Sequence, residues 1–141
     1  MKILILCTGN SCRSQMAHGF LQSFDKKLHV RSAGTEPARQ INPKAVEVMA
    51  DLEVDISHHI PHLVDEYLGE EWDYVITVCD HANETCPVFF GRVKHRLHLG
   101  FEDPSQATGT PGFIHGEYIR IRNAIRETFL EFYNENLKEK S

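Results

Sequence analysis

The sequence predicts a single α/β domain built on a mostly parallel sheet. Short branched apolar runs alternate along the chain with longer stretches whose apolar residues recur at helical spacing. The length, 141 residues, matches one average domain. Hydrophobic residues make up 41% and charged residues 25%, an ordinary globular composition that excludes a disordered or collagen-like chain. We therefore treat residues 1–141 as one domain.

The N-terminal quarter predicts a strand, a turn, a helix and a second strand. Residues 2–6 form a nearly continuous branched apolar run, which is typical of a strand buried on both faces. Turn-forming residues follow at 8–11, and residues 14–24 repeat apolar side chains at helical spacing. A short second strand is expected over 29–33, closed by Gly34.

Strands and helices continue to alternate toward the middle of the chain. Asn42 is expected to cap a helix over residues 43–52, because a proline follows at the first helical position. Residues 61–68 predict a short helix. A third buried strand is expected over 73–78 and ends at a cysteine, as the first one does, and residues 94–99 predict a fourth.

The C-terminal part predicts a loop and one long helix. Prolines and glycines mark residues 100–116 as the loop, and the helix is expected over residues 117–137. Arg122, Arg126 and Glu127 are expected to face away from the sheet. The apolar stripe that packs on the sheet consists of Tyr118, Ile121, Ile125, Phe129 and Phe132.

Charge and hydropathy exclude several classes of protein. Fifteen Lys and Arg against twenty Asp and Glu give a net charge of −5, the wrong sign for binding nucleic acid through its phosphates. The apolar run at 3–6 is far shorter than the roughly 20 residues of a membrane span, and no export signal precedes it. We therefore expect a cytoplasmic protein, in whose reducing surroundings cysteines are more often catalytic, redox-active or metal-bound than structural disulfides.

The first candidate site is the turn that follows the first strand. Five residues separate Cys7 from Arg13, which stands in the first turn of the expected helix. Backbone amides of such a loop, together with the helix N-terminus, can bind an anion. Beside an arginine and a helix N-terminus a thiol pKa falls from about 8.5, so Cys7 is a candidate nucleophile. Arg13 would clamp a tetrahedral oxyanion and Ser14 would donate to the thiolate; the alternative is a buried structural Cys7 beside a surface arginine.

The second candidate site is a cysteine pair. Six residues separate Cys79 from Cys86, so on a regular helix their Cα atoms would lie about 10.5 Å apart. A disulfide needs roughly 4.4–6.8 Å, so pairing requires the segment to bend or unwind. Two alternatives stay open from the residues alone: a metal site formed with His81 and also Cys12, and a pair of inert buried thiols.

The motifs together resemble those of one family. The stretch Cys7-Thr-Gly-Asn-Ser-Cys-Arg-Ser14 is similar to the signature of the low-molecular-weight protein tyrosine phosphatase fold, in its arsenate reductase branch. The similarity extends over nearly the whole chain. The further motifs, in the expected order, are Gln15-Met-Ala17, Ser32-Ala-Gly34, Asn42-Pro-Lys-Ala45, Asp55-Ile-Ser57 and Phe101-Glu-Asp-Pro104.

The resemblance implies a fold and a reaction. The fold is a four-stranded parallel sheet flanked by helices, and the reaction is the reduction of arsenate to arsenite. Cys7 would form the arsenate adduct and Asp103, otherwise a plain turn residue, would protonate the departing oxygen. A relay through Cys79 and Cys86 would follow, regenerated by thioredoxin, in a monomer without cofactor or metal. The implied oxyanion site consists of Thr8, Gly9, Asn10, Ser11, Cys12, Arg13 and Ser14.

Two other functions remain open at the level of sequence. A low-molecular-weight tyrosine phosphatase would use the Cys7 loop and Asp103 but would not need the second cysteine pair. A thiol sensor or metal-binding regulator would not be an enzyme at all. Relatives often carry Glu, associated with potassium binding, where His18 stands, so a potassium site is not expected. The histidines expected to face solvent are His58, His59 and His62.

Overall fold

The computed structural model describes residues 1–80, 84 and 86–138. Its strands form one four-stranded sheet in the order β2-β1-β3-β4, and each neighbouring pair is parallel. The carboxyl ends of the strands therefore meet at one edge, where α/β sheets bind their ligands. The strands are β1 (Lys2–Cys7), β2 (His29–Gly34), β3 (Trp72–Thr77) and β4 (Val93–His98).

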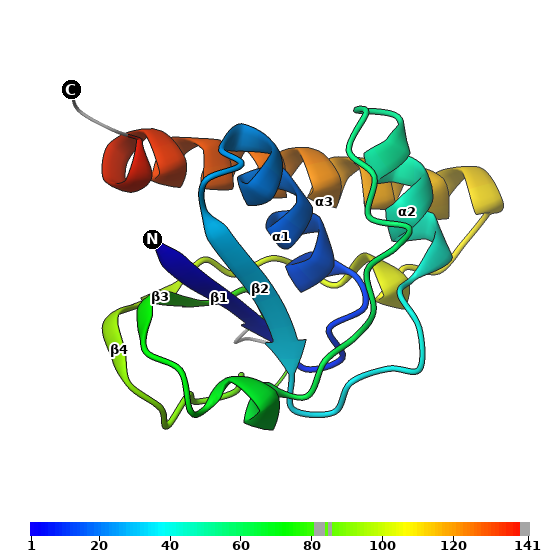
Figure 1. The fold of residues 1–141 in the computed structure, drawn as a ribbon. Coiled ribbons are helices and arrows are strands. Elements are labelled where there is room, and N and C mark those ends of the chain that lie inside the picture. The colour runs from blue at the N-terminus through cyan, green and yellow to red at the C-terminus, as the bar shows by residue number, and fades with distance from the viewer. Residues whose placement is uncertain (81–83, 85, 139–141) are drawn as a thin grey trace.

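Three α-helices within the described residues lie on one side of this sheet, the upper side in Figure 1. They are α1 (Arg13–Phe24), α2 (Pro43–Ala50) and α3 (Pro111–Phe132). Shorter turns of helix complete the chain: η1 (Val64–Tyr67), η2 (Pro104–Gln106) and the π-helical η3 (Tyr133–Leu137). The expected α/β architecture is confirmed.

Alternation along β1 divides the core into two layers. Successive side chains of a strand point to opposite faces, so Ile3 and Ile5 pack under the helices while Leu4 and Leu6 pack against η1 and neighbouring loops. All four side chains are fully buried. Both faces of the strand are therefore covered, which explains why its sequence is a continuous apolar run.

The cap of α2 is formed as expected, and it also ties the helix to its surroundings. The Asn42 side chain accepts a hydrogen bond of 2.8 Å from the amide of Lys44, with Pro43 at the first helical position. Its amide nitrogen donates to the Tyr118 hydroxyl at 2.9 Å. One residue thus ends a loop, starts α2 and joins it to α3.

Helix α3 begins six residues earlier than the sequence analysis predicted. The Thr110 hydroxyl caps it by accepting from the amide of Phe113 at 3.1 Å, and Pro111 occupies the first helical position. Gly112 and Gly116 suggested a loop, yet a capped first turn followed by a strongly amphipathic stretch tolerates them. The loop before the helix is shorter for the same reason.

Arg122 also departs from expectation. It was expected to face away from the core but is 7% exposed. Its guanidinium donates to the Val48 carbonyl at 2.9 Å and to the Asn123 side chain. The arginine satisfies an otherwise unpaired carbonyl in the last turn of α2, and this contact helps to hold α2 against α3.

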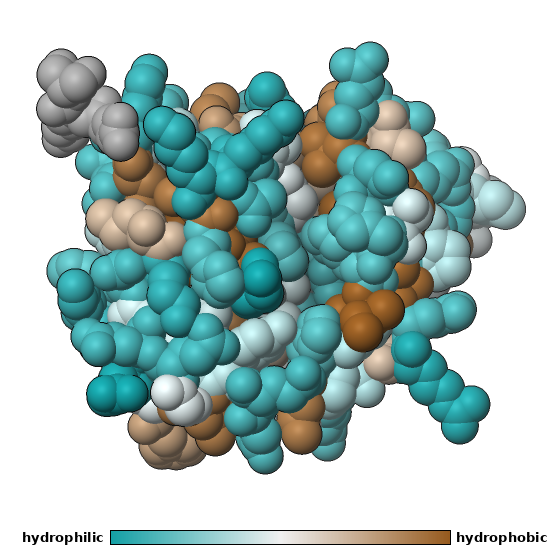
Figure 2. Space-filling model, in the orientation of Figure 1, coloured by the Kyte–Doolittle hydropathy of each residue, from teal (hydrophilic) through white to brown (hydrophobic). Residues whose placement is uncertain are grey.

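Figure 2 shows a face that is mainly hydrophilic, with hydrophobic areas that are small and separate. No described helix is long and apolar enough to cross a bilayer.

A close backbone approach at the end of β2 gives the first testable prediction. A Cβ atom on Gly34 would lie 2.2 Å from the Thr8 carbonyl oxygen, so Gly34→Ala is expected to lower the free energy of unfolding by about 1–3 kcal/mol. Gly69→Ala is the matched control, because its Cβ would meet nothing within 4 Å. Urea unfolding of both variants measures the difference; equal stabilities would contradict the prediction.

Candidate active site

The loop between β1 and α1 is held by its carbonyl groups. The carbonyls of Thr8, Gly9 and Ser11 accept hydrogen bonds of 2.8–3.0 Å from backbone amides of segment 36–42. Across a trans peptide the next N–H points the opposite way, so the amides that follow these carbonyls face away from that segment. With its carbonyls tied to segment 36–42, the loop can turn amides toward an anion, as a nest does.

Asn10 sets the shape of this loop from inside. It is 1% exposed and has a φ of 50°, a conformation that asparagine tolerates better than most residues. Its side chain donates to the Ser14 hydroxyl at 2.8 Å and accepts from the His62 amide at 2.9 Å. Because the Ser14 hydroxyl accepts here, its own proton remains available to donate, as the proposed thiolate contact requires.

Cys7 lies at the last position of β1 and is 4% exposed. Burial raises the pKa of its thiol, which outweighs the lowering by the Arg13 charge and by the Thr8 backbone. The carboxylates of Glu84 and Asp103 raise it further. The expected fall in the Cys7 pKa is therefore wrong for this form of the protein, chiefly because the thiol is buried.

Arg13 starts α1 and is 5% exposed. Both terminal nitrogens of its guanidinium donate to the Glu84 carboxylate, and one also donates to the Phe101 carbonyl at 3.0 Å. The Asp103 carboxylate lies 3.7 Å away. Hydrogen bonding to Glu84 raises the Arg13 pKa despite the burial of the side chain. This arginine is thus fully charged and is the bidentate partner of a carboxylate, the geometry that also suits an oxyanion.

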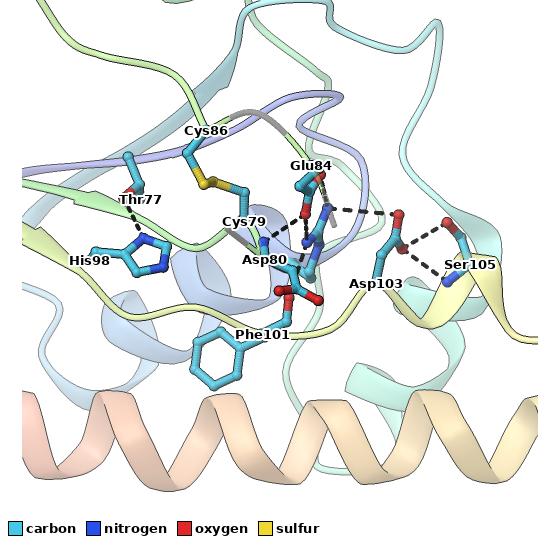
Figure 3. A network of polar contacts seen from close by, with 10 residues as sticks. Thr77, Cys79, Asp80, Glu84, Cys86, His98, Phe101, Asp103 and Ser105 are labelled. Atoms are coloured by element: carbon cyan, nitrogen blue, oxygen red, sulfur yellow. Dashed lines mark hydrogen bonds and ion pairs between the residues drawn. A yellow bond between two sulfur atoms is a disulfide. The ribbon is translucent and has the colours of Figure 1, made fainter. Parts of the chain in front are cut away.

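Asp103 is far from this arginine in the sequence but lies near its guanidinium in the fold. One carboxylate oxygen caps η2 by accepting from the Ser105 amide at 2.9 Å and the Ser105 hydroxyl at 2.7 Å. The other oxygen is the one 3.7 Å from Arg13. Figure 3 shows Asp103 between Ser105 and the group that contains Glu84. Ser105 therefore orients Asp103 so that its second oxygen points toward the Cys7 loop.

Cys79 and Cys86 form a disulfide with their Cα atoms 5.7 Å apart (Figure 3). This is well below the helical separation of about 10.5 Å, so the two cysteines do not lie on one regular helix. Cys79 lies just past β3, whose register with β1 pairs Thr77 with Leu6. Cys79 and Cys7 therefore leave neighbouring strands at the same sheet edge, as expected, and Cys7 keeps a free thiol.

The other cysteine, Cys12, belongs to the core. It is 6% exposed, packs in the apolar layer under the helices, and burial raises its pKa strongly. These surroundings favour the neutral thiol. We therefore expect Cys12 to take no part in the thiol chemistry.

One group of side chains could bind a metal ion, but its histidine is not the one that the sequence suggested. Cys79, Cys86 and His98 bring one ligand atom each within 4.8 Å of one another among the described residues. The two sulfurs are joined in the disulfide, so in this form they offer no thiolate to a metal. His81, the ligand considered from sequence, lies outside the described residues.

The rings of two histidines from distant parts of the sequence stack on each other. The rings of His18 and His59 lie 4.5 Å apart, and their partners are the Ser32 hydroxyl at 3.0 Å and the Gln15 side chain at 2.8 Å. His59 was expected to face solvent, but it is partly buried. Burial lowers the pKa of His18 to about 3 and that of His59 to about 4. Both rings are thus neutral at pH 7.

This pair makes the stability of the fold depend on pH. Unfolded histidines bind a proton near pH 6.5, whereas the native pair stays neutral until about pH 4 and 3, so stability falls as the pH drops from 6.5. The expected slope is about 1.4 kcal/mol per pH unit for each proton. Urea unfolding between pH 7 and 5 measures it. His18→Gln should flatten the slope, whereas His115→Gln, on α3, should not; an unchanged slope in His18→Gln would contradict the assignment.

Sequence reasoning missed Glu84, which makes the strongest contacts of Arg13. An acidic residue between two cysteines is a weak signal, because its partner lies far away in the sequence. The role of Asn10 in shaping the loop was missed too, since it depends on the contact with His62, 52 residues away. Gln15, which donates to the Asn10 carbonyl at 3.0 Å, was also missed.

The comparisons with known proteins agree with this geometry. The model of the low molecular weight phosphotyrosine protein phosphatase family matches residues 2–140. The chain belongs to this family.

Several similar proteins within this family are named as arsenate reductases. Arsenate reductase 2 of Staphylococcus saprophyticus is 40% identical over 133 residues, which cover 94% of this chain and 95% of that protein. A solved arsenate reductase in the phosphate-binding state is 25% identical with a TM-score of 0.79, over 95% of this chain and 97% of that one. The thioredoxin-dependent arsenate reductase of Corynebacterium glutamicum is 27% identical with a TM-score of 0.64, over 96% of this chain and 63% of that one.

Proposed function

We propose that this protein is an arsenate reductase that uses Cys7, Cys79 and Cys86 in sequence. The observation that carries the proposal is the Cys79–Cys86 disulfide at the sheet edge where the Cys7 loop lies. A phosphatase of the same fold would need the loop but not this second pair. The names of the curated and solved relatives support the same reaction.

The first step forms a bond between sulfur and arsenic. Arsenate binds to the loop amides and to Arg13 once Glu84 has left the arginine, and the Cys7 thiolate attacks arsenic. Asp103, oriented by Ser105, donates a proton to the departing oxygen, which leaves as water. Residues 8–14 hold the oxyanion throughout.

The relay then reduces arsenic. The Cys79 thiolate attacks the Cys7 sulfur, the sulfur–arsenic bond breaks, and its electron pair goes to arsenic, which leaves as arsenite. The Cys86 thiolate attacks Cys79 in the resulting Cys7–Cys79 disulfide and expels Cys7 as a thiolate. Two thiols thus supply the two electrons, and the product is the disulfide found in the structure.

Burial favours Cys86 as the sulfur that an external dithiol attacks. Cys79 is fully buried, whereas Cys86 is partly exposed and lines a cavity of about 450 Å³. A thioredoxin thiolate would form a mixed disulfide with Cys86 and release Cys79. The dependence of one relative on thioredoxin supports this partner. We propose that the enzyme works in the reducing cytoplasm as a monomer, with residues 1–141 as one domain.

Asp103→Asn tests the proton donor. Asparagine also caps a helix turn, so the fold around η2 is retained, but it has no proton of suitable acidity to give. Formation of the Cys7–arsenate adduct is expected to slow by about 10²–10⁴-fold. Rapid mixing of reduced protein with arsenate measures that step, with Glu102→Gln as the neighbouring control. An unchanged rate in Asp103→Asn would move the acid role elsewhere.

One assay tests the function as a whole. Arsenate, thioredoxin, thioredoxin reductase and NADPH are supplied with the protein, and arsenate-dependent oxidation of NADPH is followed. Hydrolysis of a phosphotyrosine substrate by the same preparation tests the phosphatase alternative. Turnover only in the second assay would replace the proposed function, and stoichiometric metal with turnover in neither would favour a thiol or metal-binding regulator.

A further inference from the structure

The carboxylate of Glu84 accepts the hydrogen bonds of Arg13 that an oxyanion would need. Arg13 donates to Glu84 through both terminal nitrogens, the arrangement by which an arginine binds a tetrahedral oxyanion. The arginine is 5% exposed and the Glu84 side chain 24% exposed. Figure 3 shows Glu84 between the disulfide and Asp103. A carboxylate from the protein thus stands where the charge of the substrate would be neutralised.

Glu84 lies within the ring of residues that the disulfide closes. Glu84 belongs to the segment that Cys79 and Cys86 close, with their Cα atoms 5.7 Å apart. The Glu84 carboxylate accepts from the Asp80 amide at 2.7 Å, and the Glu84 amide donates to the Asp80 carbonyl at 2.9 Å. These reciprocal bonds lock the residue next to Cys79, which the disulfide links in turn to Cys86.

We propose that Glu84 is an internal competitor for the oxyanion site: while Cys79 and Cys86 are joined, its carboxylate neutralises Arg13, and arsenate or phosphate binds only after the disulfide is reduced. This inference rests on the proposed function, because it assigns a role to the oxidised end state of the relay. It prevents spent enzyme from binding new substrate while Cys79 and Cys86 cannot resolve an adduct.

The surrounding carboxylates also disfavour the binding of an oxyanion. Five carboxylates, including the two that approach Arg13, line a cavity of about 670 Å³, and those of Glu102 and Glu117 pair with Arg120. With Arg13 neutralised, this group of carboxylates repels an oxyanion. Glu84 also raises the pKa of the Cys7 thiol, so the nucleophile is less reactive in the oxidised form. The carboxylates are Asp80, Glu84, Glu102, Asp103 and Glu117.

Because the two equilibria are linked, the competition can be measured either through phosphate binding or through reduction of the disulfide. If the disulfide weakens phosphate binding by some factor, phosphate must favour the reduced form by the same factor. A coupling of roughly tenfold lies within the usual range for two linked sites. It corresponds to about 30 mV in the reduction potential of the Cys79–Cys86 pair.

The first experiment measures binding of inorganic phosphate by calorimetry. The wild type, Glu84→Gln and Glu102→Gln are compared after reduction by dithiothreitol and after oxidation by diamide, which removes two electrons and two protons from the two thiols. Peptide mapping verifies the Cys79–Cys86 bond. Oxidation is expected to weaken binding roughly tenfold or more in the wild type and in Glu102→Gln, but less than about threefold in Glu84→Gln. Equal weakening in Glu84→Gln, or none in the wild type, would overturn the proposal.

The second experiment needs only the wild type and therefore does not depend on how the variants fold. Reduced dithiothreitol passes two electrons and two protons to the disulfide and becomes its own cyclic disulfide. Saturating phosphate is expected to shift this equilibrium toward the protein dithiol by the same roughly tenfold factor. No shift would refute the competition. Because neither experiment involves turnover, failure of the arsenate reductase assay would be seen separately.

Discussion

Arsenate-dependent turnover of the Cys7→Ser variant is expected to fall by at least about 10⁴-fold. A serine hydroxyl is not ionised at neutral pH, so the attack on arsenic is lost. An oxygen atom also cannot form the disulfide that releases arsenite, so the second step is lost as well. Oxidation of NADPH in the thioredoxin-coupled assay measures the effect, with circular dichroism as the check that the variant is folded.

Cys12→Ser is the matched control, since it makes the same chemical change five residues away. Cys12 packs in the core at 6% exposure and its neutral thiol has no role in the relay. This variant is expected to retain most of its turnover. Activity near the wild-type level in folded Cys7→Ser, or loss of activity in folded Cys12→Ser, would contradict the assignment of the nucleophile.

The two variants of the second cysteine pair should stop the reaction at different points. In Cys86→Ser, Cys79 can still attack the adduct, so one arsenite is released and the enzyme stalls as a Cys7–Cys79 disulfide. In Cys79→Ser the adduct meets no internal thiol in the relay, so even the first release is expected to be largely lost. Multiple turnover should fall to background in both, because each lacks one sulfur of the final disulfide.

Peptide mapping after a single exposure to arsenate distinguishes these states. The wild type is expected to carry Cys79–Cys86, the bond seen in the structure, and Cys86→Ser to carry Cys7–Cys79. Arsenite released in one turnover is counted in parallel. Repeated turnover by Cys79→Ser with thioredoxin as the sole reductant would refute the relay, and so would a first release of arsenite from Cys79→Ser equal to that of the wild type.

The relay is what separates this chain from a phosphatase of the same fold. The loop, Arg13 and Asp103 suit any tetrahedral oxyanion, because they recognise charge and shape. A second thiol allows the arsenic bound to Cys7 to be reduced, because it forms a disulfide with Cys7 as arsenite leaves. Cys79, two positions beyond a strand that pairs with β1, is placed to be that thiol.

Local chemistry was sufficient to predict the elements that position the site. The apolar run of β1 and the Asn42 cap of α2 lie within one residue of their expected places, because burial of a whole strand and the start of a helix depend on neighbouring residues. The placement of Cys7 and Cys79 at the same edge of the sheet was also predictable, since parallel strands place their carboxyl ends there. The family resemblance contributed the roles of Asp103 and of the relay cysteines.

Contacts between distant segments were decided by the tertiary structure alone. Arg122 is buried because α3 crosses the end of α2 and a carbonyl there needs a donor, and His18 meets His59 because α1 packs beside the segment before η1. Glu84 pairs with Arg13, 71 residues away in the chain. The local patterns of the sequence predicted the strands and the oxyanion loop, and the family resemblance indicated which thiols react. Burial and long-range pairing, which no local pattern encodes, determined the charge state of the site and the residue that occupies its arginine.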